Sequence, residues 1–144
     1  MKFFIAFDNS DGAKKALKFA MKFKPIADEY VICYISPLII GAGPTYGSYT
    51  PPTVFSKSDN ASQEVLNSAK ELIETENVNA SFLGLEASGD QIARVMTNAA
   101  IERGADVIIT GTRKLSGLSK VFLGSISSEI VKLSTLPVLV IPPG

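Results

Sequence analysis

The chain has 144 residues, 46% of them hydrophobic, and its 14 Lys and Arg residues balance its 14 Asp and Glu residues. This length suits one well-formed core, so we expect a single domain over residues 1–144. Zero net charge supplies no field that would draw the protein onto nucleic acid or an anionic membrane, and we expect neither as a partner. The chain has no His, which excludes Ser-His-Asp and Cys-His catalysis and removes a common zinc ligand.

The single cysteine, Cys33, lies in the apolar run 30–35. We expect it to be a small buried core residue, and no disulfide can form within the chain, which suits a reducing compartment. The first apolar run, 3–7, is too short to span a membrane and is interrupted by Asp8. We therefore expect a soluble, cytoplasmic protein.

The first third of the chain has two strand patterns around one helix pattern. Residues 3–7 predict a strand that ends at the turn-forming and cap-forming residues 8–12. Apolar residues at helical spacing from Ala13 onward predict an amphipathic helix that stops before Pro25. The near-continuous apolar run 30–35 predicts a strand buried in a parallel sheet.

The middle of the chain begins with a segment rich in Gly and Pro, residues 37–60. This composition predicts a long irregular loop, acting either as a lid or as a mobile segment. Helical spacing returns over 62–74, and residues 80–85 predict a third strand. Residues 88–90 offer an N-cap for a helix that ends at Gly104.

The last third predicts a strand at 107–110, a helix over 125–133 and a final strand at 138–141. The apolar residues of that helix are expected on roughly one face: Ile126, Ile130, Val131 and Leu133. Strands and helices thus alternate throughout. The alternation predicts an α/β protein with a doubly wound, five-stranded parallel sheet and four helices, whose ligand crevice lies beyond the carboxyl ends of the strands. Asp8 and Gly111 are both expected at such ends.

A glycine pattern lies between the fourth strand and the last helix. Gly111 is followed, after a spacer, by Gly124 and Ser125 at the helix start. Free amides and the positive end of the helix dipole would face this loop, so the order of elements predicts a phosphate-binding loop of a non-Walker kind. The alternative is that the glycines only make turns and that Ser125 or Ser127 only caps the helix.

The chain resembles the universal stress protein family over nearly its whole length, from residues 4–10 through 88–90 to 136–141. Nucleotide-binding members carry a glycine, two residues, a second glycine, nine residues, then glycine followed by serine or threonine. The resemblance implies a three-layer sandwich of the Rossmann-like or flavodoxin-like kind found in adenine nucleotide alpha hydrolases. It also implies ATP binding, with or without Mg.

This sequence matches that motif at Gly111, Gly124 and Ser125 but has Lys114 at the second glycine. If the backbone has positive φ there, a lysine is strained by roughly 1–2 kcal/mol and its Cβ crowds the phosphates. Alternatively its ammonium group donates to the phosphates, with Arg113 adding charge.

The resemblance places Asp8 at the ribose or adenine end, although Asp8 could equally order the turn into the first helix. It places Ile35 against adenine, a position where any core also favours isoleucine. The remaining residues implied are Ala6 and Phe7 on the wall beside Asp8, Thr110, Gly111, Thr112, Arg113 and Lys114 along the ribose and phosphates, and Gly124, Ser125, Ile126 and Ser127 at the phosphates.

These residues are compatible with three functions. The leading one is a cytoplasmic stress-response protein that binds ATP and acts as a nucleotide-dependent regulator. No catalytic residue is assigned, because no evident base faces the γ-phosphate, while slow hydrolysis or autophosphorylation stays open. The alternative is a homodimeric interaction protein of this family that binds no nucleotide. The third function is an enzyme of nucleotide chemistry with a related α/β fold, which would require further catalytic residues in a longer chain.

The final strand, Val138 to Ile141, forms an exposed sheet edge unless something covers it. Family members pair through this strand, so the resemblance implies a homodimer with a two-fold axis. The flanking prolines could instead protect the edge by themselves.

Overall fold

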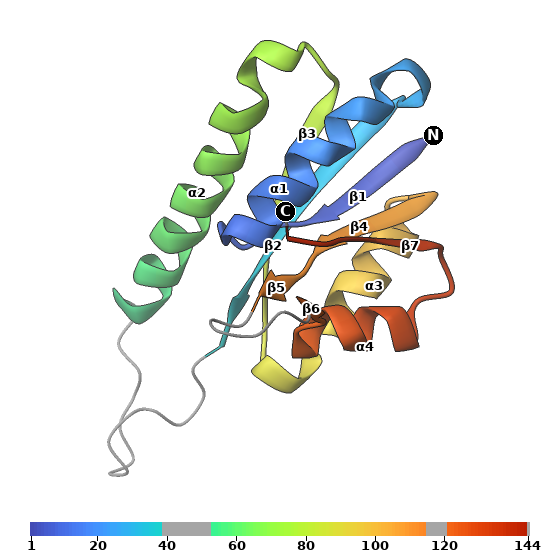
Figure 1. Ribbon diagram of the computed structural model, residues 1–144. Helices are drawn as coiled ribbons and strands as arrows, with labels where there is room; N and C mark the ends of the chain where they lie inside the picture. The colour runs from blue at the N-terminus through green and yellow to red at the C-terminus, as the bar shows by residue number, and fades with distance from the viewer. Residues whose placement is uncertain (39–52, 115–120, 144) are drawn as a thin grey trace, which may run out of the picture.

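In a computed structural model of the chain, the structure describes residues 1–38, 53–114 and 121–143, with only the backbone described at 53–59, 113–114 and 121–122. Five parallel strands form one sheet in the order β3-β2-β1-β4-β7. Figure 1 shows helices α1 and α2 on one face of this sheet and α3 and α4 on the other. The predicted α/β fold with a five-stranded parallel sheet and four helices is confirmed.

The strands of the sheet are β1 (Lys2–Ala6), β2 (Glu29–Pro37), β3 (Ala80–Ala87), β4 (Val107–Gly111) and β7 (Val138–Ile141). The α-helices are α1 (Asp11–Ala20), α2 (Thr53–Ile73), α3 (Ile92–Glu102) and α4 (Ser125–Leu133). Short 3-10 helices occupy Met21–Ile26, Glu74–Glu76 and Gly89–Gln91. Two short strands, β5 (Arg113–Lys114) and β6 (Val121–Phe122), pair antiparallel in a separate ribbon.

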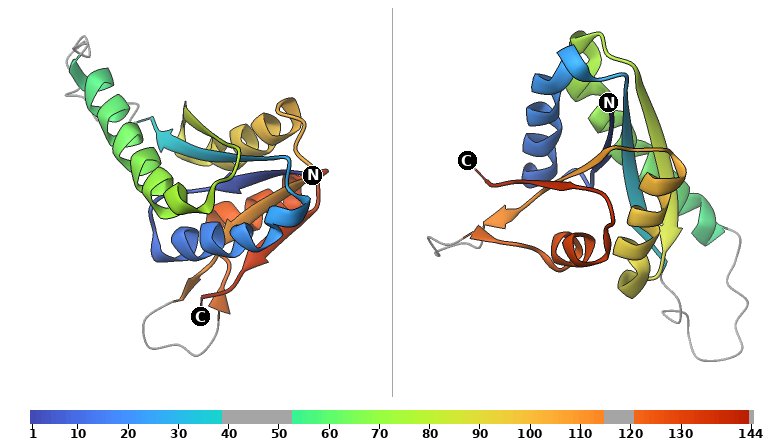
Figure 2. Two further views of the ribbon diagram at one scale, coloured as in Figure 1. Left: turned by 90° about the horizontal axis from the view of Figure 1, so that it is seen from above. Right: turned by 90° about the vertical axis from the view of Figure 1, so that its right-hand side faces the viewer.

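The core consists of two apolar layers, one on each face of the sheet. Phe3, Ile5 and Leu17 belong to the layer under α1 and α2. Phe4, Cys33 and Ile108 belong to the layer under α3 and α4. Period-two alternation along each buried strand produces this division, because successive side chains point to opposite faces. The two views of Figure 2 show the sheet between its helical layers.

Cys33 is fully buried in the second layer, as predicted. Burial disfavours the charged thiolate and raises the pKa of the Cys33 thiol to about 12. The thiol therefore acts as a small apolar group of the core at neutral pH.

The order of the strands in the sheet determines where the expected ligand crevice lies. The chain runs from β1 outward through β2 to β3, then returns to the other side of β1 for β4 and β7. The strand order therefore reverses between β1 and β4, and the carboxyl ends of these two neighbours lie side by side. Ligand sites of open α/β sheets form at this kind of reversal.

Several predicted element ends differ from the structure. After α1 ends at Ala20, a 3-10 helix continues the helical path through Pro25. Helix α2 begins at Thr53, so the last part of the predicted loop 37–60 is helical; residues 39–52, with Tyr46 and Tyr49, lie outside the described residues. Helix α3 begins only at Ile92, preceded by a 3-10 turn. It ends at Glu102, and Gly104 two residues later has a φ of 71°, the expected left-handed conformation after a helix end.

The prediction for the face of α4 was wrong at two positions. Ile130 is fully buried, but Ile126 and Val131 are 37% and 48% exposed. Residues 126 and 131 lie about 140° apart around a helix, so a single narrow contact with the sheet cannot bury both. Among the described residues, no helix has both the length and the apolar character needed to cross a bilayer.

Candidate functional site

A pocket of about 370 Å³ opens at the carboxyl ends of β1 and β4. Its walls come from the ends of β1, β2 and β4 and from the helices α1, α3 and α4. The lining residues are Ala6, Phe7, Asp8, Ser10, Ala13, Tyr34, Ile35, Ile92, Met96, Thr110, Gly111, Thr112, Gly124, Ser125, Ile126 and Ser127. The pocket thus lies at the reversal of strand order.

The structure brings together eleven of the thirteen residues named from the sequence. They are Ala6, Phe7, Asp8, Ile35, Thr110, Gly111, Thr112, Gly124, Ser125, Ile126 and Ser127. The other two, Arg113 and Lys114, form β5, where Lys114 pairs with Val121; their side chains lie outside the described part of the chain. Strand pairing gives Lys114 an extended backbone, in which a lysine is not strained. The ligand roles of all thirteen residues stay predictions.

Sequence reasoning missed Ser10, Ala13, Tyr34, Ile92 and Met96 as pocket residues. Ile92 and Met96 lie one turn apart on α3, and their spacing marked them as apolar helix positions without showing that they line a cavity. Tyr34 was hidden in the apolar run of β2, although it is adjacent to Ile35. Only the packing of α3 across the end of β2 brings these side chains to the pocket.

The turn from β1 into α1 has a fixed geometry. Asp8 Oδ1 accepts a hydrogen bond from the Ser10 amide at 3.0 Å, and Ser10 Oγ accepts one from the Ala13 amide at 3.2 Å, which caps α1. Between them Asn9 has a φ of 66°, a left-handed conformation that asparagine tolerates well. Asp8 therefore orders the turn, as one reading of the sequence held, and lines the pocket as well.

The end of β4 packs directly against the start of α1. A Cβ added at Gly111 lies 2.3 Å from the Gly12 carbonyl oxygen, and one added at Gly12 lies 2.3 Å from the Thr112 carbonyl oxygen. No side chain fits at either position without moving the backbone. The contact with α1 is enough to require glycine at 111, whether or not a ligand also approaches it.

Gly124 differs, because a Cβ added there meets no atom within 4 Å. It is the N-cap of α4 and makes no side-chain cap hydrogen bond. No described residue accepts from the amides of Ser125 and Ile126 in the first turn, and the exposed Ser125 hydroxyl also has no partner among the described residues. The interpretation that Ser125 or Ser127 caps α4 is therefore wrong. The first-turn amides of α4 have no acceptor among the described residues, and they lie at the pocket.

Ser127 faces inward and is buried. Its hydroxyl donates to the Gly111 carbonyl at 3.0 Å and lies 3.1 Å from Thr110 Oγ1. Thr112 donates from both its amide and its hydroxyl to the Ile141 carbonyl, each at 3.1 Å. These bonds fasten α4 and β7 to the end of β4. Ser127 thus holds the site together, while Ser125 keeps its hydroxyl free.

The end of β2 carries an open backbone edge. The Phe7 amide donates to the Cys33 carbonyl at 2.9 Å, whereas Tyr30 and Leu38 donate to residues beside β3. Backbone groups alternate sides along a strand, so odd residues of β2 face β1 and even residues face β3. Because β1 ends at Ala6, the N–H and C=O of Ile35 face the pocket. This edge presents one donor and one acceptor.

No group of three or more Cys, Asp or Glu side chains within the described ranges could hold a metal ion. Asp8 is the one carboxylate in the described part of the pocket lining. The pocket combines an apolar end at Ile35, Ile92 and Met96 with amides at the start of α4 that have no acceptor within the described ranges. This arrangement suits a flat heteroaromatic ring joined to a phosphate group.

The fold and the position of the pocket define an open α/β protein with a crevice where its strand order reverses. The sequence model of the Universal stress protein family matches residues 1–142, and the chain belongs to that family. Universal stress protein YxiE of Bacillus subtilis strain 168 is 30% identical over 146 residues, covering 97% of each chain.

Solved structures agree in fold. A universal stress protein family member from Burkholderia pseudomallei has a TM-score of 0.75 at 23% identity, covering 99% of this chain and 96% of its own. The universal stress protein of Archaeoglobus fulgidus in complex with dAMP has 0.68 at 20%, covering 97% and 96%. The Arabidopsis thaliana family protein At3g01520 with AMP bound has 0.68 at 15%, covering 100% and 92%. Some members of this fold thus bind adenine nucleotides.

Proposed function

We propose that this protein is a cytoplasmic stress-response regulator that binds ATP, carried as Mg-ATP, in the pocket between β1 and β4. The observation that carries the proposal is the open first turn of α4. Free amides at Ser125 and Ile126, an uncapped Gly124 and the helix dipole together favour a phosphate group. The bound nucleotides of the two solved relatives support the same ligand class.

The rest of the pocket fits the other parts of an adenine nucleotide. Adenine presents a ring nitrogen acceptor beside an amino donor, which complements the N–H and C=O of Ile35. Ile92 and Met96 are 8% and 4% exposed and offer an apolar surface for the ring. Mg would neutralise part of the charge of the phosphates, and the Ser125 hydroxyl is the residue of this pocket that would supply a further oxygen ligand.

The role is regulatory, with at most slow hydrolysis. Asp8, the carboxylate of the described lining, lies at the end of β1 with one oxygen engaged by the Ser10 amide. The α4 end, where the phosphates bind in this proposal, presents hydroxyls and amides. Nucleotide occupancy then alters the surface formed by α4 and the β5–β6 ribbon, where a partner can distinguish the two states.

Thermal unfolding tests the site. A ligand at 100 times its Kd adds about 2.7 kcal/mol, which raises the midpoint by roughly 5–10 °C for a domain of this size. We expect this rise with Mg-ATP in the wild type and in Gly89→Val, and its loss in Gly124→Val. Both glycines accept a Cβ without contact, so the pair separates pocket filling from a general glycine effect. AMP and GTP serve as ligand controls.

No shift at millimolar nucleotide, in protein shown to be free of copurified nucleotide, contradicts the proposal. That result favours the alternative, a family member that acts through protein contacts alone. A shift that Gly124→Val leaves unchanged moves the nucleotide to another site.

We further propose a homodimer through β7. This strand is an edge of the sheet, and Ile141 faces β4 through its bond from Thr112. By alternation Val138 and Val140 turn their backbone groups to the open side, where an antiparallel copy satisfies them. Sedimentation tests this: a species of about twice 15.3 kDa is expected for the wild type and a monomer for Val140→Pro, which removes an outward N–H. A monomeric wild type contradicts it.

A further inference from the structure

The outer face of α1 carries a row of positive charges that has no acidic partner in the described part of the chain. Its members, here called the lysine row, are Lys14, Lys15 and Lys18 of α1 and Lys22 of the 3-10 helix that follows. The three on α1 lie on the side opposite its buried Ala and Leu residues. The ion pairs that the described lysines do make lie outside the row. The row is therefore a strip of uncompensated positive charge on a chain of zero net charge.

The stability of α1 does not account for the lysine row. Lys14 and Lys18 are four residues apart, and Lys22 repeats that spacing, so like charges are neighbours along the helix and repel each other. Lys18 alone lies in the last turn, where the helix dipole favours a cation. The Lys22 ammonium lies 5.0 Å from the ring centre of Phe19, a contact that leaves its charge uncompensated. A partner that supplies negative charge would relieve the repulsion within the row.

The spacing of the lysine row fits an acidic segment in extended form. Four residues of α-helix advance about 6 Å along the axis, which separates Lys14 from Lys18 by about that distance. Alternate residues of an extended chain are about 6.6–6.8 Å apart and point to the same side. Carboxylates at every second position of such a segment can therefore each meet one lysine of the row, at Lys14, Lys18 and Lys22.

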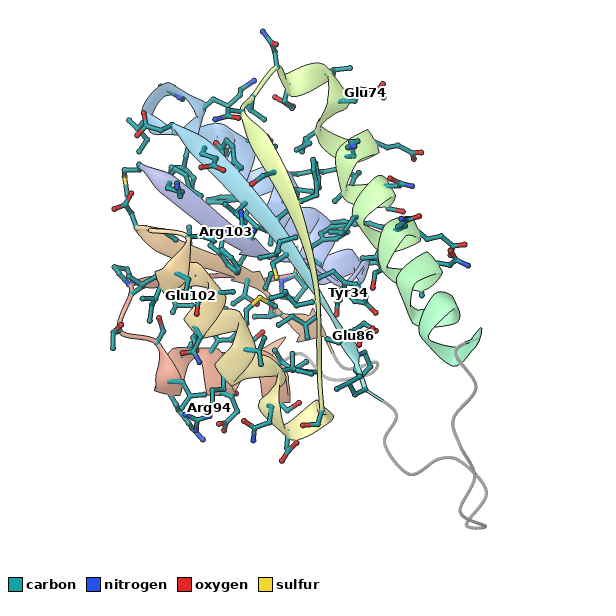
Figure 3. The ribbon with its side chains drawn as sticks, turned by 180° about the vertical axis from the view of Figure 1, so that it is seen from behind. Tyr34, Glu74, Glu86, Arg94, Glu102 and Arg103 are labelled. Atoms are coloured by element: carbon teal, nitrogen blue, oxygen red, sulfur yellow. The ribbon has the colours of Figure 1, made fainter. Side chains whose placement is uncertain are left out.

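The surroundings of the lysine row restrict the shape of that partner. Helix α2 lies beside α1 on the same face of the sheet (Figure 1) and carries exposed carboxylates at Glu64 and Glu71. Figure 3 shows Glu74 where α2 ends. A bilayer or a nucleic-acid duplex would cover α2 as well as α1 and meet these negative charges, whereas a single extended segment contacts α1 alone. The large exposed apolar residues also include none of α1, so the row offers a bilayer no apolar anchor.

We propose that the lysine row of α1 is a docking surface for an acidic segment of a partner protein, bound in extended form with carboxylates at alternate positions. Complementary charge carries the recognition, so association should be fast at low salt and should weaken as salt screens the charges. None of the four lysines belongs to the described pocket lining. The docking surface is therefore separate from the nucleotide site proposed above and does not depend on it.

Fluorescence anisotropy with two labelled peptides tests the proposal. The acidic probe alternates Glu with Ala, and the neutral probe has Gln in place of every Glu. We expect the wild type to bind the acidic probe at least about 10-fold more tightly at low salt, and to lose that preference at about 1 M salt, where the screening length is about 3 Å. The combined variant Lys14→Gln/Lys18→Gln/Lys22→Gln should bind the acidic probe about 10-fold more weakly, because three exposed ion pairs are lost. Its unfolding midpoint should not fall, since the change removes repulsion between like charges.

The combined variant Lys70→Gln/Arg94→Gln/Lys132→Gln is the matched control. Its three side chains are exposed, lie on α2, α3 and α4, and lower the net charge by the same amount when changed. Lys70 also matches Lys22 in its ring contact, since its ammonium lies 5.3 Å from the ring centre of Phe82. The affinity of this control for the acidic probe should stay within about twofold of that of the wild type, because charges away from α1 are screened.

Three results would overturn the inference. Equal weakening by both combined variants would show that net charge attracts the peptide without a defined docking surface. Equal affinity of the wild type for the acidic and neutral probes would remove the role of charge. Binding to vesicles rich in phosphatidylserine without binding to the acidic probe would assign the lysine row to a membrane. Each of these results leaves the proposed nucleotide site untouched, because calorimetry with Mg-ATP on the same proteins measures that site separately.

Discussion

The two ends of the sheet treat polar groups in opposite ways. At the amino end Lys2 Nζ donates to the Arg103 carbonyl and pairs with Glu29, and the Met1 ammonium pairs with Asp28. At the carboxyl end of the same strands, the first amides of α4 and the edge of Ile35 lack such partners within the described structure. The charged groups at the amino end are paired inside the protein, whereas several backbone groups at the carboxyl end have no partner among the described residues.

The cavities at the two ends differ in the same sense. A second hollow of about 280 Å³ lies at the amino end, lined by Met1, Phe3, Phe23, Ile26, Val107, Pro137, Val138 and Leu139. No residue of that lining has a polar side chain. This difference indicates that backbone N–H and C=O groups without a partner, more than the volume of a cavity, favour the binding of a polar ligand. The four predictions below test whether the amino end serves stability and the carboxyl end serves binding.

Phe3→Ala should have the largest effect. Phe3 is 2% exposed and stacks on Phe23 and Tyr30 at centroid distances of 5.2 and 5.5 Å. Its truncation should lower the free energy of unfolding by about 3–5 kcal/mol, measured by urea unfolding. The midpoint shift caused by nucleotide should persist, because Phe3 lies at the opposite end. A small loss of stability, or the loss of the midpoint shift caused by nucleotide, would contradict the division between a stabilising amino end and a binding carboxyl end.

Gly12→Ala should cause the second largest loss of stability. Its Cβ meets the Thr112 carbonyl oxygen at 2.3 Å, so α1 and the end of β4 must separate, at a cost of about 3 kcal/mol. Gly89→Ala, where nothing crowds the new carbon, should stay within about 0.5 kcal/mol of the wild type. Thermal unfolding of the three proteins measures this. Equal unfolding midpoints for all three proteins would show that β4 and α1 can move apart at no cost in stability, which would contradict this prediction.

Two serines of α4 should separate stability from binding. Ser127→Ala removes the bond to Gly111 and should cost about 1–2 kcal/mol of unfolding free energy. Ser125→Ala removes an exposed hydroxyl and should leave stability unchanged while weakening nucleotide binding. Unfolding and calorimetry on both variants measure the pair. A stability loss at Ser125 equal to that at Ser127 would contradict the different roles of the two hydroxyls.

The ion pair of Lys2 and Glu29 should give the smallest effect. The hydrogen bond from Lys2 holds the pKa of the Glu29 carboxyl below its usual value of 4.5. A lowered folded pKa stabilises the protein above about pH 4.5, and that contribution is lost as pH falls through the folded pKa. Glu29→Gln should therefore lose less stability between pH 5 and pH 3 than the wild type, by under about 1 kcal/mol. If the unfolding free energies of Glu29→Gln and the wild type fall equally between pH 5 and pH 3, the ion pair of Lys2 and Glu29 does not contribute to stability.

The sequence predicted the fold well because the central strands β1, β2 and β4 are buried on both faces. Runs such as 30–35 and 107–109 are apolar throughout, and their alternation with helical patterns leaves few topologies. Predictions failed where local signals were weak: the 3-10 path through Pro25, the early start of α2 at Thr53 and the ribbon of β5 and β6.

Most of the candidate site could also be named from the sequence, because strand ends are readable and strand order brings them together. The roles of the named residues were harder to assign. Gly111 and Gly124 look alike in the sequence, yet only Gly111 is crowded by the backbone of α1. Ser125 and Ser127 also look alike, and a difference of two residues turns one outward and the other toward Gly111.

The sequence by itself determined the parallel sheet, the family and the position of the glycine loop, since these follow from apolar periodicity and from residue types at fixed spacings. Only the tertiary structure decided which polar groups remain free. Whether Thr110, Thr112 and Ser127 can donate to a ligand depends on carbonyl groups that packing brings beside them from β4 and β7. Hydrogen-bond capacity left over after folding is a property of three-dimensional neighbours, and no spacing along the chain specifies it.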